Sequence, residues 1–233
     1  MKTISVIIPL YNEEQNINAV YREASTVLTT AGLAYELIFV NDGSTDKSLP
    51  ILMEIADKDD KVKVVSHAQN LGQGAAVSSG IKAAQNQYIS FMDCDMQSNP
   101  ADIVPMLDLC NQYQIVLGWR SKRDDSFFKK ISSKVGNSLV RFVFKTHVED
   151  AGCSLKIGPA DAFKNIQYFK NYHRYLGLIL IKTGYTYTYF ETHHRFRNAG
   201  KSKHSVLKFL KVIPEWIALK YKYLPKALKQ HQR

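Results

Sequence analysis

Short apolar runs alternate with polar turns along the first hundred residues. Four runs are rich in β-branched side chains and predict buried strands: 4–10, 35–40, 62–65 and 88–92. The segments between them, 13–30, 47–57 and 70–84, are predicted helices, and Asn12 is the expected cap of the first. This alternation is typical of an α/β fold with a mainly parallel sheet flanked by helices.

Polar clusters follow each of the predicted strands. They occupy 9–13, 41–46, 70–74 and 93–97. Ligands of such sheets bind at the carboxyl ends of the strands. The four clusters are therefore expected to converge on one crevice.

Two carboxylates, Asp93 and Asp95, stand one residue apart directly after the last of these strands. Such a pair can hold a hard divalent cation and leave open positions for phosphate oxygens. By itself the pair is a weak signal, because two nearby Asp in a loop are more often a solvated turn. The preceding polar clusters are what favour the metal site.

The second half of the chain continues with fewer signals. Residues 115–120 predict a strand that ends in Arg120, and 186–191 predict another strand. Residues 126–145 have the pattern of an amphipathic helix, which would either border a lipid site or pack on the domain.

The length, hydrophobic fraction and cysteine content of the chain are those of a globular protein. The chain has 233 residues, 45% of them hydrophobic, and its three cysteines form no CxxC pair. A cytoplasmic compartment is expected from this cysteine usage. No run reaches the roughly 18–20 apolar residues of a spanning helix.

The positive charge lies at the C-terminal end. From Arg195 onward there are eleven Lys or Arg and one acid, Glu215, so this stretch carries the whole net charge of +10. Residues 206–229 predict a basic amphipathic helix, interrupted at Pro214 and Pro225, that would lie on a membrane surface or pack on the domain. A nucleic-acid partner is not expected.

Four segments in order carry a family resemblance: SVIIPLYNEE (5–14), VNDGSTD (40–46), NLGQGAA (70–76) and MDCDMQ (92–97). They resemble the family-2 glycosyltransferases of GT-A fold, and more narrowly the dolichol-phosphate mannose synthase-like branch, which moves a sugar onto polyprenyl phosphate. The stretch RNAGKSK (197–203) is similar to a loop of the same branch.

The resemblance implies a role for several residues toward a nucleoside diphosphate sugar. Asp42 would accept hydrogen bonds from the base, although a turn or cap role is the alternative. The expected donor-binding residues are Pro9, Tyr11, Glu13, Asp42, Gly72, Gly74, Asp93, Gln97, Arg197 and Lys203.

A divalent cation, Mg²⁺ or Mn²⁺, is implied at Asp93, Asp95 and Gln97. It would neutralise charge that grows on the leaving diphosphate. The expected acceptor-binding residues are Arg120, Arg123 and Lys134. The expected catalytic residues are Asp95, Arg120, Asp150 and Arg197, with Asp150 positioning the acceptor because a phosphate needs little base catalysis.

The resulting prediction is a GT-A domain over 1–205, with a donor half of about 1–100 and an acceptor half of about 101–205, followed by a tail over 206–233. It would transfer a sugar to polyprenyl phosphate with inversion, at the inner face of the cell membrane. A saccharide hydroxyl acceptor is the alternative, with Asp150 as the base. The sequence leaves a homo-oligomer open.

Overall fold

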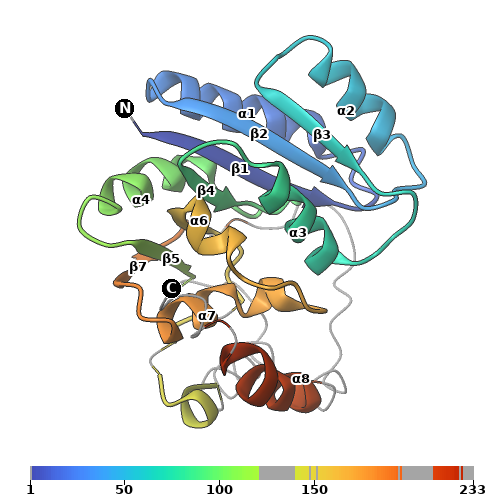
Figure 1. Cartoon of the computed structure of the whole chain (residues 1–233). Coiled ribbons are helices and arrows are strands. Elements are labelled where there is room, and N and C mark those ends of the chain that lie inside the picture. The colour runs from blue at the N-terminus through green and yellow to red at the C-terminus, as the bar shows by residue number, and fades with distance from the viewer. Residues whose placement is uncertain are drawn as a thin grey trace.

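A seven-stranded sheet lies at the centre of the computed structural model (Figure 1). The structure describes residues 2–120, 140–146, 148–150, 152–193, 195, 212–225 and 227. The strands are β1 (Thr3–Leu10), β2 (Ala34–Asn41), β3 (Val62–Ser66), β4 (Tyr88–Phe91), β5 (Ile115–Trp119), β6 (Lys156–Pro159) and β7 (Tyr187–Glu191). Their spatial order is β3-β2-β1-β4-β6-β5-β7.

The sheet is mainly parallel, as predicted. The strands β1 to β4 pair in parallel, and so do β5 and β7. The exception is β6, which runs antiparallel to both β4 and β5. Because β6 alone is reversed, the carboxyl ends of β4 and β5 still meet at the same edge of the sheet.

Helices cover both faces of the sheet, which confirms the predicted layers. One face carries α1 (Ile17–Thr30), α2 (Ser48–Ala56) and α4 (Ile103–Leu109), and the other carries α3 (Gln73–Ala83), α6 (Ala160–Lys164) and α7 (Leu176–Lys182). Successive side chains of a strand point to opposite faces. Accordingly Val6 and Ile8 belong to the apolar cluster on the face of α1, α2 and α4, and Ile7 belongs to the apolar cluster on the face of α3, α6 and α7.

The expected start of the first helix is wrong. The helix α1 begins at Ile17, and Asn12 has a positive φ of 55° rather than a cap geometry. The Asn12 side chain instead accepts a hydrogen bond from the backbone nitrogen of Thr45 at 2.8 Å. The Asn12 side chain thus makes a tertiary contact instead of the helix cap that the local sequence predicted.

The described residues also include two short 3₁₀ turns, η1 (Pro100–Asp102) and η2 (Tyr172–Arg174). The tail contributes α8 (Val212–Ala218), which continues as a π-helical turn, η4 (Leu219–Tyr223). Pro214, where the sequence predicted an interruption, lies inside the described helix α8. The boundary expected at 205 and 206 lies outside the described residues and stays a prediction.

The described part of the tail packs on the domain. Trp216 and Leu219 are buried in the apolar cluster that contains α3 and α7. The Tyr223 ring stacks on Phe169 with ring centroids 4.1 Å apart. This is the packing alternative of the sequence analysis, at least for the side chains of 214–223. None of the helices in the described ranges is long and apolar enough to cross a bilayer.

Candidate active site

A cleft of about 340 Å³ opens where the carboxyl ends of β1, β2 and β4 meet. Seven of its lining residues are ones that the sequence singled out: Pro9, Tyr11, Glu13, Asp42, Gly72, Asp93 and Asp95. The polar clusters do converge, because the three strands are parallel neighbours. The cleft is large enough for part of a nucleotide sugar.

The loops after β1 and β2 are joined to each other beside this cleft. The backbone nitrogens of Asn12 and Glu13 donate to Ser44 Oγ at 2.9 Å and Ser48 Oγ at 3.0 Å. In return the backbone nitrogen of Lys47 donates to Glu14 Oε2 at 2.9 Å. The two walls are therefore held in register by bonds from one loop to the other.

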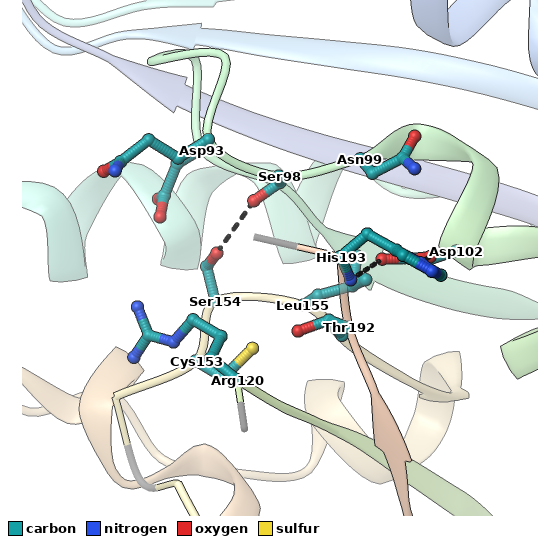
Figure 2. A pocket seen from close by; sticks show the side chains of 11 residues that line it. Asp93, Ser98, Asn99, Asp102, Arg120, Cys153, Ser154, Leu155, Thr192 and His193 are labelled. Atoms are coloured by element: carbon teal, nitrogen blue, oxygen red, sulfur yellow. Dashed lines mark hydrogen bonds and ion pairs between the residues drawn. The ribbon is translucent and has the colours of Figure 1, made fainter. Parts of the chain in front are cut away.

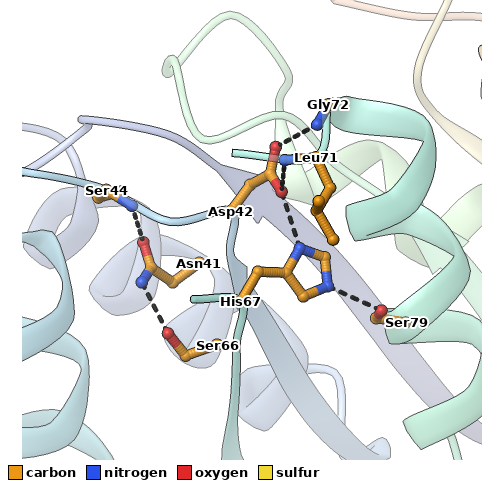
Figure 3. Close-up of polar contacts among 8 residues, drawn as sticks. All are labelled: Asn41, Asp42, Ser44, Ser66, His67, Leu71, Gly72 and Ser79. Carbon is orange, nitrogen blue, oxygen red and sulfur yellow. Dashed lines mark hydrogen bonds and ion pairs between the residues drawn. The ribbon is translucent and has the colours of Figure 1, made fainter. Parts of the chain in front are cut away.

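Asp42 fixes the third loop (Figure 3). Its Oδ2 accepts the backbone N–H of Gly72 at 2.8 Å, and its Oδ1 accepts that of Leu71 at 3.0 Å. His67 Nδ1 lies 2.7 Å from the same Oδ1, and its Nε2 lies 2.9 Å from Ser79 Oγ. The buried carboxylate thus organises the loop before α3, in addition to lining the cleft.

The glycines of that loop differ in their surroundings. Gly72 has a positive φ of 91° and lies directly before α3, at the cleft. Gly74 does not line the cleft. A Cβ there would lie 3.1 Å from the backbone nitrogen of Asn171 and 3.2 Å from His173 Nδ1, so Gly74 permits close packing of α3 against η2.

Asp93 and Asp95 both face the cleft. Burial and the neighbouring charge of Asp95 raise the pKa of Asp93. Gln73 Nε2 donates to Asp93 Oδ1 at 3.1 Å. Two carboxylates that repel each other beside a cleft fit a cation that completes its shell with phosphate oxygens and water.

No group of three or more His, Cys, Asp or Glu in the described part of the chain could form a metal centre alone. Such a centre is not needed for Mg²⁺, which is usually held by one or two carboxylates together with substrate phosphates. Gln97, the third expected ligand, lies outside the cleft lining. Its backbone nitrogen donates to Asp95 Oδ1 at 3.1 Å, and its side-chain Nε2 donates to the carbonyl of Arg195 at 3.4 Å.

A second, smaller cavity of about 30 Å³ lies beyond Asp93 (Figure 2). Asp93, Ser98 and Ser154 line it, and the two serine hydroxyls are 3.5 Å apart. Arg120 reaches the same cavity from the end of β5 and lies across from Asp93. The two cavities share Asp93, so the expected donor and acceptor sides are adjacent.

Arg120 and Asp150 form a forked ion pair. Arg120 Nε donates to Asp150 Oδ2 at 2.7 Å, and Nη2 donates to Oδ1 at 3.0 Å. Burial opposes the charge of Arg120, but this pairing outweighs it and raises the pKa of the guanidinium. The structure therefore brings together Arg120 and Asp150, two of the four residues that the sequence placed on the acceptor side.

The model of the family described as Glycosyl transferase family 2 matches residues 5–167. The chain belongs to this family.

Similar proteins agree with this assignment. The chain is 29% identical over 225 residues to a dodecaprenyl-phosphate galacturonate synthase from Rhizobium johnstonii. This alignment covers 94% of the chain and 66% of the synthase. The chain is 27% identical over 215 residues to an undecaprenyl-phosphate 4-deoxy-4-formamido-L-arabinose transferase from Pectobacterium carotovorum, covering 91% and 66%. The chain thus spans just under two thirds of the length of these relatives.

A solved structure shows the same fold. Glucosyl-3-phosphoglycerate synthase from Mycobacterium tuberculosis, in complex with Mn²⁺, UDP and glucosyl-3-phosphoglycerate, superposes with a TM-score of 0.65. The match covers 99% of this chain and 80% of that one, at 19% sequence identity. This likeness confirms the GT-A architecture of the family 2 domain.

Sequence reasoning missed two residues near this site, His67 and Lys156. His67 follows β3 directly, so the rule that polar clusters at strand ends build the site would have found it. Lys156 is buried in β6, where burial lowers its pKa, and its Nζ donates to the carbonyl of Cys153. No spacing in the sequence marks Lys156, because its neighbours are set by the reversed strand β6 between β4 and β5.

Four expected site residues lie outside the described residues: Arg123, Lys134, Arg197 and Lys203. Their assignments to acceptor or donor stay predictions. The helix expected over 126–145 is described only from residue 140, and residues 140–144 are helical.

Proposed function

We propose that this family 2 chain transfers a sugar from a nucleoside diphosphate sugar to polyprenyl phosphate, with a divalent cation and inversion at the anomeric carbon. The observation that carries the proposal is the placement of Asp93, which lies on the wall shared by the cleft and the cavity that contains Arg120. A donor diphosphate on one side and an anionic acceptor on the other would meet there. The names of the two curated relatives, both polyprenyl-phosphate enzymes, support this acceptor.

The donor half would hold the nucleotide by its three joined loops. Asp42 would accept from the base, while Pro9, Tyr11 and Glu13 would flank it. Asp93 and Asp95 would hold Mg²⁺ or Mn²⁺, with Gln97 at the edge of the site. When bound, the cation would supply charge neutralisation for the departing diphosphate.

The acceptor phosphate would approach past Arg120. A guanidinium fork pairs well with phosphate oxygens. The phosphate oxygen is already ionised at neutral pH and would attack the anomeric carbon from the face opposite the diphosphate, so one displacement inverts that centre. Asp150 would orient Arg120 during this approach and would take no proton.

Asp150 would carry a different role with a saccharide hydroxyl acceptor. It would then be the general base. Both Asp150 oxygens accept hydrogen bonds from Arg120 and one also accepts the backbone N–H of Gly152 at 3.1 Å, which suits a fixed orienting group better than a proton acceptor. The lipid phosphate is therefore the preferred acceptor.

Transfer of label from a panel of UDP- and GDP-sugars to undecaprenyl phosphate tests the proposal. Label in the organic extract, lost in Asp95→Ala and retained in Asp60→Ala, is the expected result. Asp60 is a matched control because it is exposed and precedes β3, at the opposite edge of the sheet from the cleft. Asp95-dependent release of free sugar alone would keep the donor site and reject the lipid acceptor.

A lipid acceptor requires a site at the membrane surface. We propose that the chain is peripheral on the inner face of the membrane and that the basic tail over 206–233 contributes to this contact. Within the described tail, Ile217, Lys220, Tyr221 and Lys222 are exposed beside the buried Trp216 and Leu219.

A further inference from the structure

The segment that follows β7 is fastened to the loop that follows Asp95. The backbone nitrogen of Arg195 donates to the carbonyl of Gln97 at 3.0 Å, and Gln97 Nε2 returns a bond to the Arg195 carbonyl at 3.4 Å. These residues are 98 positions apart in the chain. One backbone bond and one side-chain bond therefore join the two segments at the edge of the proposed metal site.

The Arg195 guanidinium extends this contact in two directions. Its Nη2 donates to Asn99 Oδ1 at 2.9 Å, and its Nη1 lies 2.7 Å from Glu23 Oε1 of α1. Asn99 Oδ1 also accepts the backbone N–H of Ala101 and so caps η1. One side chain thus ties the end of the metal loop, residues 93–99, to a helix of the domain.

A second contact anchors the same segment. His193 donates its backbone N–H to Asp102 Oδ2 at 2.8 Å, and its Nδ1 lies 2.6 Å from Oδ1 (Figure 2). Asp102 is buried, whereas the His193 side chain is largely exposed. Together Arg195, Asn99, Glu23, Asp102 and His193 form what is called the clasp below.

The metal loop is strained between its ligands and the clasp. Met96, between Asp95 and Gln97, has a positive φ of 63°. A left-handed conformation costs a residue with a side chain about 1–2 kcal/mol and persists only where the surroundings enforce it. The Gln97 backbone nitrogen holds Asp95 Oδ1 on one side of this strained residue, and the clasp holds Gln97 on the other.

We propose that Arg195 is a positioning residue for the divalent cation. Its guanidinium joins Asn99 to Glu23 and so fixes its own backbone, which holds Gln97, keeps Met96 in the left-handed region and keeps the Asp95 carboxylate aimed at the cleft. The inference rests on the proposed metal-dependent function and adds a residue that neither the sequence motifs nor the relatives assign. Residues that orient metal ligands typically change metal affinity about 10–100-fold when they are removed. The effect on affinity should exceed the effect on turnover at saturating metal.

Titration of the full chain with MnCl₂ tests this directly, with free Mn²⁺ followed by electron paramagnetic resonance in the presence of UDP and, separately, GDP. Arg195→Met should raise the Mn²⁺ dissociation constant about tenfold. In Arg195→Lys the shorter amine can reach only one of Asn99 and Glu23, so its Mn²⁺ dissociation constant should lie between those of Arg195→Met and the wild type. Lys58→Met is the matched control, because it removes an exposed ion pair with Glu54 on the opposite part of the domain and should leave the constant unchanged.

Amide hydrogen exchange over residues 93–99 in the metal-free chain supplies a second readout. Arg195→Met should accelerate exchange there, and Lys58→Met should not. Unchanged Mn²⁺ affinity in a folded Arg195→Met would overturn the inference and leave the proposed function intact. A wild type that binds no Mn²⁺ with either nucleotide would instead reject the metal-dependent function, and the positioning role with it.

Discussion

The guanidinium of Arg120 and the carboxylate of Asp150 face each other edge to edge, with two nitrogen–oxygen distances of 2.7 and 3.0 Å. Asp150 also accepts the backbone N–H of Gly152, and a Cβ on Gly152 would lie 3.1 Å from Arg120 Nη2. Gly152 therefore lies close against the fork. Asp150 thus holds Arg120 in place. A substitution of Asp150 can therefore distinguish a phosphate acceptor, which needs only an oriented Arg120, from a hydroxyl acceptor, which needs Asp150 as a base.

Asp150→Asn should weaken lipid use without abolishing transfer. The amide keeps one acceptor oxygen but loses the charge, so Arg120 is held less firmly. The KM for undecaprenyl phosphate should therefore rise about tenfold, which corresponds to a loss of roughly 1.4 kcal/mol of binding free energy. Steady-state kinetics with Asp161→Asn, an exposed carboxylate of α6, as the control would measure this. A loss of kcat in the range of about 10²–10⁴-fold would mark Asp150 as a general base and favour a hydroxyl acceptor.

Gly43 is expected to be indispensable for the third loop of the cleft. It has a positive φ of 69°, and a Cβ there would lie only 2.3 Å from the backbone carbon of Gln69. Gly43→Ala should displace the loop that Asp42 anchors, lower the free energy of unfolding by about 1–3 kcal/mol beyond the backbone cost, and weaken UDP or GDP binding. Urea unfolding and titration calorimetry would measure the two effects.

Gly32→Ala is a control that has the backbone cost of a positive φ without a steric clash of the new Cβ. Gly32 has a similar φ of 65°, but a Cβ there would meet nothing within 4 Å. It should therefore show only the backbone cost, about 1–2 kcal/mol, with unchanged nucleotide binding. Equal effects of the two substitutions would mean that the contact with Gln69 does not shape the cleft.

Glu36 should make stability depend on acid pH. Burial alone would raise the pKa of this carboxyl, but bonds from Lys63, Ser5 and the backbone of Gln85 outweigh it and lower the pKa. The stabilisation is then complete above the unfolded pKa, near 4.3. It is lost as the pH falls through the lower folded value.

Glu36→Gln should be less stable than the wild type at pH 7 by about 1–3 kcal/mol. For a chain of this size that corresponds to a fall in Tm of about 2–4 °C per kcal/mol. The difference should shrink as the pH falls below about 4, where the wild type loses the same charge. Thermal unfolding across pH 3–7 tests this, and a difference that stays constant over that range would refute the role assigned to the charge.

Local signals in the sequence were sufficient for most of the fold and for the cleft. Strand ends are marked by composition, and parallel neighbours bring their ends together, so Asp42, Asp93 and Asp95 could be placed on one edge without coordinates. The start of α1 failed because Asn12 bonds to Thr45, 33 residues away. Local propensity carries no information about such a partner.

The rest of the site depends on pairings that sequence spacing does not encode. Arg195 meets Gln97, His193 meets Asp102, and Lys156 lies in the reversed strand β6. The second half has shorter strands and fewer repeated patterns than the first, so neither the reversal nor the clasp was predicted. Contacts of this kind become visible only once distant segments are placed side by side.

The described tail separates into a packed side and an exposed side, and the two should respond differently to substitution. Trp216 and Leu219 are buried, whereas Ile217 and Tyr221 are 57% and 72% exposed. Trp216→Ala should therefore destabilise the chain by about 3–5 kcal/mol. Ile217→Ser combined with Tyr221→Ser should leave the free energy of unfolding almost unchanged.

The same double substitution tests the proposed membrane contact. If Ile217 and Tyr221 insert at a bilayer surface while Lys220 and Lys222 meet anionic headgroups, binding to phosphatidylglycerol vesicles should weaken about tenfold, the equivalent of roughly 1.4 kcal/mol of apolar burial. Met53→Ser removes a comparably exposed apolar side chain from α2 and should not change vesicle binding. Co-sedimentation with anionic and with neutral vesicles measures both. Binding that is equal for the two lipids, or equally weakened by Met53→Ser, would place the membrane contact elsewhere on the chain.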